Sequence, residues 1–245
     1  MPLAQVATLL AGIEHRSGGV LFSGADTIAP GALYVMGYNP GGVADEGDIP
    51  GAGTVGASLA DAGTRSGWNE WADERYGRDG TYSPFQNNIR TVFEALGADP
   101  RRTFSTNALF VRSRNAEGVE GPWDLWWDHC WPVHQVFLRV VRPRVVVCLG
   151  NGGALSTWEL LRLTRRGEQR RYTSNWTSAD PDEPAKDGKW QPEVTFDLGE
   201  GASHTCAVLG LPHPSPRVQA SWPLGEAANT KLAMARAVLA GWEKP

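Results

Sequence analysis

The sequence predicts an α/β protein in which a parallel sheet is covered by helices on both faces. Four short apolar segments alternate with segments of helical periodicity, which is the pattern of a parallel sheet with crossover helices. The clearest of the four, RVVVCLG at 144–150, is apolar throughout, as expected of a strand buried on both faces. The chain has 245 residues, enough for a substantial core, and we expect 1–245 to form a single domain.

The first half of the chain contains the first two strands. ALYVMG at 32–37 is the first strand, and RTFST at 102–106 is the second. Between them, Ser83 and Pro84 are typical of a helix start, and Gly97 is typical of a helix end. Ahead of the first strand we expect an amphipathic helix whose apolar face consists of Val6, Leu9, Leu10 and Ile13.

The second half of the chain supplies the other two strands and three helices. Pro132 falls inside the first of these helices, where we expect it to kink the axis. A glycine-rich turn at 150–153 connects the third strand to the next helix. In order, the expected elements are a helix at 124–141, a strand at 144–150, a helix at 154–164, a strand at 204–211 and a helix at 224–241.

Two long segments, 43–83 and 165–203, interrupt this alternation, and we interpret both as insertions. The first is rich in Gly, Asp and Ala, and the second is polar with several prolines. Loops of this length in a compact domain are usually functional or disordered. Five arginines crowd the run RLTRRGEQRR at 162–171, which suits either a solvated loop or an edge that contacts phosphates.

The composition excludes several classes of protein. The net charge is −4, so overall charge does not indicate nucleic-acid binding. The three cysteines, Cys130, Cys148 and Cys206, are too widely spaced for a disulfide framework or a zinc site and fit the core. Eleven tryptophans are explained first by core packing. Without a long apolar run or a secretory signal, we expect a cytoplasmic protein that does not enter membranes.

Polar side chains follow the predicted strands at the points where they end. Asn39 follows the first strand, Asn107 ends the second, and His213 follows the fourth within the loop GLPHPSPR at 210–217. Prolines at every second position make that loop stiff, although a solvated proline-rich turn would look the same. Because the carboxyl ends of parallel strands form the ligand crevice of an open sheet, we expect these side chains to share one site.

The site lacks the motifs of several common chemistries. No phosphate-binding GxxxxGK[ST] loop, GxSxG elbow or HExxH helix is present. His129 and His134 are five residues apart, so they do not share a helical face well and make a poor metal pair. The groups that the predicted strand ends do offer are amides, one imidazole, an aromatic ring and glycines. This set suits a leaving group that departs as an anion and is stabilised by hydrogen-bond donors.

Four segments resemble the uracil-DNA glycosylase superfamily. GYNPGG at 37–42 and HPSPR at 213–217 are similar to its two signature motifs, and PFQNN at 84–88 and STNALFVRS at 105–113 are similar to its base-stacking and base-reading segments. The resemblance implies a three-layer α/β/α sandwich around a four-stranded parallel sheet. It also implies an enzyme that flips a pyrimidine out of DNA and cleaves its bond to deoxyribose.

The resemblance assigns a role to each matching residue in this chain. Asn39 would hold the attacking water, and His213 would donate a hydrogen bond to the pyrimidine O2. Phe85 would stack on the flipped ring, although it could equally be a core residue of its helix. Asn107 would read the base edge or merely end its strand. Gly37 and Tyr38 would offer backbone contacts to the O2 edge, and Gly41 would border position 5 of the base.

The resemblance further implies that the partner is DNA, single- or double-stranded, bound by a monomer. Ser215 would grip a phosphate, and Arg217 would fill the gap in the duplex or touch a phosphate. No cofactor or metal is expected, because the four cysteines of the iron–sulfur branches are missing. The remaining residues assigned to DNA binding are Pro40, Gly42 and Arg112.

One departure from the superfamily bears on substrate choice. The uracil-specific branch has a tyrosine where this chain has Gly41, so a wall against 5-substituents is missing. We therefore expect a monofunctional glycosylase for uracil or a 5-modified pyrimidine. Two alternatives remain open: an antiviral glycosylase that excises hydroxymethylated or glucosylated cytosines from phage DNA, and a catalytically weak DNA-binding module that senses damage.

Overall fold

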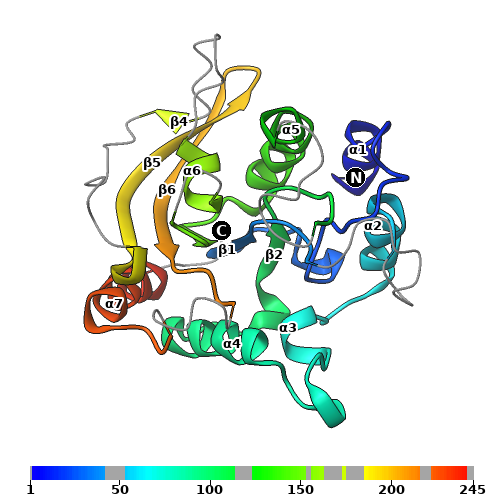
Figure 1. Cartoon of the computed structure of the whole chain (residues 1–245). Coiled ribbons are helices and arrows are strands. Elements are labelled where there is room, and N and C mark those ends of the chain that lie inside the picture. The colour runs from blue at the N-terminus through cyan, green and yellow to red at the C-terminus, as the bar shows by residue number, and fades with distance from the viewer. Residues whose placement is uncertain are drawn as a thin grey trace.

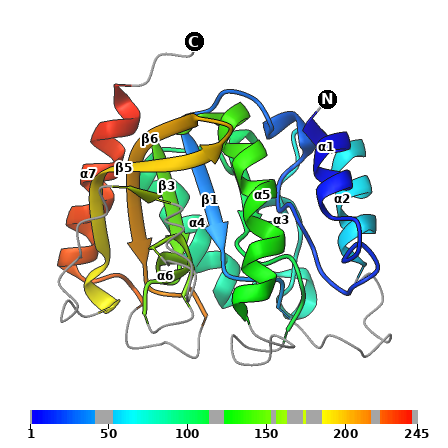
Figure 2. The same ribbon diagram turned by 90° about the horizontal axis from the view of Figure 1, so that it is seen from above.

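The computed structural model describes residues 2–41, 53–113, 123–152, 156–162, 173–174, 185–215 and 222–241. Within these residues a six-stranded sheet has the order β2-β1-β3-β6-β5-β4 (Figures 1 and 2). Its strands are β1 (Leu33–Gly37), β2 (Phe104–Asn107), β3 (Val145–Leu149), β4 (Thr173–Ser174), β5 (Lys189–Gly199) and β6 (Ala202–Leu211).

The four predicted strands form the parallel part of the sheet. β1 pairs in parallel with both β2 and β3, and β3 pairs in parallel with β6. The expected count of four strands is too low, because β5 and β4 add two antiparallel strands beside β6. β5 lies within the segment 165–203, which the sequence predicts to be a long, loop-like insertion. The strand was not recognised in the sequence because many of its residues are polar. Its side chains largely alternate in burial, and it pairs with β6 along nearly the whole length of β6.

Helices cover both faces of the sheet, as expected of a three-layer α/β/α sandwich. α1 and α5 lie on one face, and α4 and α7 lie on the other (Figures 1 and 2). The helices are α1 (Pro2–Leu9), α2 (Val55–Thr64), α3 (Glu70–Asp73), α4 (Pro84–Leu96), α5 (Trp123–Val141), α6 (Thr157–Arg162) and α7 (Glu226–Ala240), with short 3-10 turns at Ala25–Thr27, Arg78–Gly80, Pro100–Arg102 and Ala185–Asp187.

Local sequence signals account for the ends of α4. Ser83 and Gln86 form a reciprocal capping box, in which each side chain accepts from the backbone N–H of the other residue. Gly97 ends the helix with a positive φ of 67°, a conformation that glycine adopts without strain. The N-terminal helix is shorter than the apolar pattern suggests, because α1 ends at Leu9 and Gly12 takes a φ of 102°.

Two hydrophobic cores result, one on each face of the sheet. One gathers side chains of α1, α2, α5 and α6, including Trp127 and Trp131, and the other gathers those of α3, α4 and α7. Cys130, Cys148 and Cys206 are buried, as expected of core residues. Among the described helices, none is both long and apolar enough to cross a membrane.

The described part of the first insertion is folded against the body of the protein. α2 buries Val55, Leu59 and Ala62, and α3 buries Trp71, whose ring centroid lies 4.9 Å from that of Phe22. Isolated β-bridges join Ser17 to Thr54 and Ser23 to Asn69. The insertion thereby forms a wall beside the carboxyl ends of β1 and β2, where the site lies.

Candidate active site

A cleft of about 990 Å³ opens at the carboxyl ends of the parallel strands. One wall is the turn that follows β1, another is the loop that follows β6, and a third is the insertion that carries α2 and α3. Of the twelve residues that the sequence assigns to the site, Gly42 and Arg217 lie outside the described residues. The other ten all line this cleft: Gly37, Tyr38, Asn39, Pro40, Gly41, Phe85, Asn107, Arg112, His213 and Ser215.

The Asn39 amide has a defined orientation. Its Nδ2 faces three acceptors, the carbonyl oxygens of Pro40 and Val111 at 3.2 Å each and Ser113 Oγ at 2.8 Å. A rotated amide would set Oδ1 against the two carbonyl oxygens, so the network assigns the nitrogen to that side. Asn39 Oδ1 is therefore the atom that remains to accept a hydrogen bond in the cleft.

The His213 imidazole has a defined tautomer. The backbone N–H of Ser215 donates to Nδ1 at 3.2 Å, so the ring proton of the neutral form sits on Nε2. His213 keeps an exposed face in the cleft, and the partial desolvation of its ring lowers the pKa below its usual value, which favours the same neutral form. Two side chains hold the loop: Asn88 Nδ2 donates to the carbonyl of Pro214 at 2.9 Å, and Trp222 Nε1 donates to that of His213 at 3.1 Å.

Asn107 presents a buried acceptor without a partner. The residue is 1% exposed, and no described residue donates to its Oδ1. Its Nδ2 reaches the carbonyl of Gly19 at 3.4 Å. Gly37 allows this arrangement, because a Cβ there would lie only 3.0 Å from Asn107 Oδ1. An unsatisfied buried acceptor costs about 1–3 kcal/mol, a cost that a hydrogen-bond donor on a bound molecule would remove.

Two aromatic side chains flank these groups. The Phe85 ring lies partly exposed in the cleft, with its centroid 5.8 Å from the His213 ring, although it also packs at the edge of the core. Tyr38 is 6% exposed, its hydroxyl has no partner among the described residues, and burial raises its pKa to about 12. Its carbonyl and that of Gly37 accept from the backbone after β2, which fixes the turn.

Gly41 has free space beside it within the described part of the chain. A Cβ at this position would meet no atom of those residues within 4 Å. The guanidinium of Arg112 donates through Nη1 to the Gly41 carbonyl, whereas its buried Nε has no partner in the described part of the chain. Burial lowers the pKa of Arg112, with the nearby Glu70 and Tyr76 acting in the opposite direction.

Sequence reasoning missed the residues that the insertion contributes. Arg65, Trp68, Glu70, Glu74 and Tyr76 line the same cleft. Burial raises the pKa of the Glu70 carboxyl to about 7. The run GWNEWADERY at 67–76, dense in aromatic and charged residues within a long insertion, was the available signal. It carries no motif, so it could not be placed without the tertiary structure.

His129 and His134, the two histidines of the helix α5, do not line the cleft. His134 is fully buried, with Nδ1 bonded to the Tyr34 hydroxyl at 2.8 Å and Nε2 to the Ala108 carbonyl at 2.9 Å. Burial lowers its pKa to about 4, so it serves as a neutral bridge in the core. The arginine-rich run at 162–171 lies outside the described residues apart from the backbone at its first residue.

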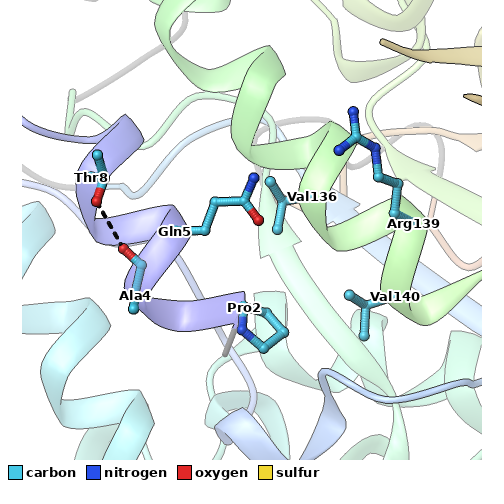
Figure 3. A pocket seen from close by; sticks show the side chains of 7 residues that line it. All are labelled: Pro2, Ala4, Gln5, Thr8, Val136, Arg139 and Val140. Atoms are coloured by element: carbon cyan, nitrogen blue, oxygen red, sulfur yellow. Dashed lines mark hydrogen bonds between the residues drawn. The ribbon is translucent and has the colours of Figure 1, made fainter. Parts of the chain in front are cut away.

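A second cavity, of about 490 Å³, lies between α1 and α5 (Figure 3). Its polar side chains are Gln5, Thr8 and Arg139; Thr8 bonds back to the Ala4 carbonyl of its own helix at 3.1 Å. None of the predicted site residues lines this cavity.

Comparison with known proteins agrees with the geometry. A search of curated proteins found no match. The family model for the uracil DNA glycosylase superfamily matches residues 29–233, a span that contains every strand of the sheet and all residues assigned to the cleft by the sequence motifs. The chain therefore belongs to the uracil DNA glycosylase superfamily, a family of DNA glycosylases.

Proposed function

We propose that the protein is a monofunctional DNA glycosylase that flips out uracil or a 5-modified pyrimidine and hydrolyses its N-glycosidic bond. The observation that carries this proposal is the shared cleft of Asn39 and His213, one offering an acceptor for water and the other a donor for the leaving base. Asn107 adds a buried, unpaired acceptor for the edge of the same base. A module that only senses damage would not need the first two groups.

Binding requires the nucleotide to leave the stack, because the base edges cannot be surrounded within a duplex. Phe85 would stack on the extruded ring, and Asn107 Oδ1 would accept from N3–H of uracil or from the amino group of cytosine. Pro40, Gly42 and Ser215 would contact the DNA backbone beside the flipped nucleotide. Arg217 would occupy the gap in the duplex or bind a phosphate.

Cleavage breaks the bond between C1′ and N1, and its electron pair leaves with the base. The negative charge develops on O2, where the Nε2–H of His213 would donate a hydrogen bond. A water held by Asn39 Oδ1 would attack C1′ and release its proton to the departing base or solvent. Since an amide cannot itself take up this proton, turnover would be slower than with a carboxylate at the same position.

The open space at Gly41 favours substrates with a group at position 5. The cleft volume of about 990 Å³ lies at the upper end of the roughly 300–1,000 Å³ that ligand pockets span, so it is larger than a pyrimidine needs. This observation also favours a second candidate function, the excision of hydroxymethylated or glucosylated cytosines from phage DNA. At this site, the two candidate functions, repair of damaged bases and defence against phage DNA, differ in the group that would occupy the space beyond Gly41.

An abasic-site assay tests the proposal. Matched oligonucleotides, single- and double-stranded, carry uracil, 5-hydroxymethyluracil, 5-hydroxymethylcytosine or its glucosylated form, and strand breaks are counted after alkali. We expect cleavage of at least one modified pyrimidine. Binding without abasic sites on any substrate would favour the damage-sensing module.

Gly41→Tyr is expected to abolish cleavage of 5-substituted pyrimidines while any uracil activity survives. A ring at this position would extend into space that no described residue fills, and it would exclude the substituent by steric overlap. The measurement is the single-turnover rate on uracil and 5-hydroxymethyluracil in the same sequence. If the wild type cleaves uracil alone and the variant behaves identically, the open-pocket interpretation is wrong.

Asn107→Asp is expected to penalise uracil more than cytosine derivatives at the position-4 edge. An ionised carboxylate only accepts, so it would repel O4 of uracil, whereas it could accept from the amino group of cytosine. Asn107→Ala is the control for the lost Gly19 contact, because it removes the amide without adding charge. Equal losses on both bases would show that Asn107 does not face the base edge.

A further inference from the structure

The cleft continues past Gly41 into a polar arm contributed mainly by the insertion. We use the name polar arm for six residues that line this part of the cleft: Arg65, Trp68, Glu70, Glu74, Tyr76 and Arg112. Its outer part is internally paired. Arg65 Nη1 and Trp68 Nε1 approach Glu74 Oε1 at 3.4 and 3.3 Å, and the Arg65 guanidinium lies 4.2 Å from the Trp68 ring centroid. We call the other three residues, Glu70, Tyr76 and Arg112, the inner part of the arm.

Two contacts connect this inner part to the base site. The Arg112 guanidinium is bonded to the carbonyl of Gly41, the residue that borders position 5 of the base. The backbone N–H of Glu70 donates to the Phe22 carbonyl at 2.8 Å, and the Phe22 ring lies 3.5 Å from where a Gly37 Cβ would be. Arg112 and Glu70 are therefore both attached to residues of the base site, and both line the cleft that a group leaving past Gly41 would enter.

The hydrogen-bonding groups there are complementary to a hydroxyl. Glu70, Tyr76 and Arg112 line the same cleft, and the charge of Arg112 acts to lower the pKa of both the Glu70 carboxyl and the Tyr76 hydroxyl, against the effect of burial. Arg112 Nε is buried and has no partner among the described residues, so one donor is left for a ligand. A hydroxyl can accept from the guanidinium and also pair with Glu70, donating to its ionised carboxylate or accepting from its protonated form. A methyl group would desolvate both and satisfy neither.

The charges oppose the obvious alternative occupant, a DNA phosphate. Glu70 and Glu74 place two carboxyl groups in the arm, while Arg65 is held by Glu74 and also by Asp61 at 2.8 Å. A phosphate would meet carboxylates without a surplus of free cations, and like charges repel. An uncharged hydroxylated group avoids that repulsion.

We propose that Glu70, Tyr76 and Arg112 form a subsite for a hydroxyl-bearing substituent at position 5 of the flipped pyrimidine and select it over a methyl group. This assigns Arg112 to the substituent in place of DNA, and it rests on the proposed glycosylase function. Sites that hydrogen-bond a substrate hydroxyl discriminate strongly against the analogue without it, because their polar groups are then left unpaired.

The test compares wild type with Glu70→Gln and Tyr76→Phe on duplexes that carry uracil, thymine or 5-hydroxymethyluracil at one position. Glu94→Gln, an exposed change of the same kind on α4, is the control. We expect the wild-type kcat/KM to favour hydroxymethyluracil over thymine by about 10²-fold or more. Glu70→Gln and Tyr76→Phe should each reduce that ratio by about tenfold, which is the effect of losing one hydrogen bond to a charged group. The rate of uracil cleavage should stay nearly unchanged in both variants.

Further arms separate the possible outcomes. Duplexes with 5-hydroxymethylcytosine, plain or glucosylated, show whether the bound hydroxyl belongs to the hydroxymethyl group or to a sugar. Equal losses on uracil and hydroxymethyluracil in Glu70→Gln would overturn the subsite. If the protein cleaves none of the duplexes, their dissociation constants are measured by fluorescence anisotropy instead. A hydroxymethyl preference in binding that Glu70→Gln removes would then support the subsite while the glycosylase proposal fails, and no preference would overturn the subsite.

Discussion

Asn39→Ala is expected to lower the single-turnover cleavage rate by about 10²-fold or more with little change in DNA affinity. Oδ1 is the atom of Asn39 that remains for a water, and misplacing a reacting group by about 1 Å can already cost 10²-fold. The measurement is the cleavage rate at saturating enzyme, together with the dissociation constant of the same oligonucleotide.

The variant also removes the contacts of Nδ2, so its effect must be separated from loosening of the turn. Ser113→Ala is the matched control, because it deletes the 2.8 Å anchor of Asn39 and keeps Oδ1. We expect a much smaller loss for Ser113→Ala, with both variants melting near the wild-type temperature. An unchanged rate for Asn39→Ala on a good substrate would rule out its role in holding water.

His213→Ala is expected to slow the chemical step by about 10²–10³-fold, the typical loss when one donor to a developing oxyanion is removed. The structure gives the reason in the tautomer: the Ser215 N–H occupies Nδ1, so Nε2 carries the proton that O2 would receive. The measurement is again the single-turnover rate at saturation, because affinity and chemistry are separated there.

Asn88→Ala provides the control for loop position. It removes the 2.9 Å bond to the Pro214 carbonyl and leaves the imidazole intact. We expect a loss well below that of His213→Ala. If His213→Ala weakens binding alone and keeps its full rate at saturation, His213 positions DNA and does not stabilise the leaving base.

Much of the fold was predictable because its signals are local. An apolar segment such as RVVVCLG needs no distant partner to indicate a buried strand, and β3 forms there. Ser83, Gln86 and Gly97 bound α4 through contacts within a few residues. By contrast, β5 is amphipathic and short of apolar residues, and only its pairing with β6 makes it a strand.

The insertion at 43–83 was unpredictable for the same reason. α3 is a single turn of four residues, too short for a periodic pattern, and it exists because Trp71 packs against Phe22 and Phe93. Glu70 reaches the cleft only as a consequence of that packing. No spacing within the sequence connects it to Gly41 or Asn107.

The sequence alone determined which groups stand at the ends of the strands, because strand ends follow from the apolar segments and the loops begin at once with Asn39 and His213. The tertiary structure decided what those groups present. Pro40, Val111 and Ser113 orient the Asn39 amide, and the backbone of Ser215 selects the His213 tautomer. The Ser215 contact spans only two residues, but the bonds from Asn39 to Val111 and Ser113 and from Asn88 to the His213 loop join segments far apart in the chain. These long-range bonds, and the burial that raises the pKa of Glu70, are not encoded in any local pattern.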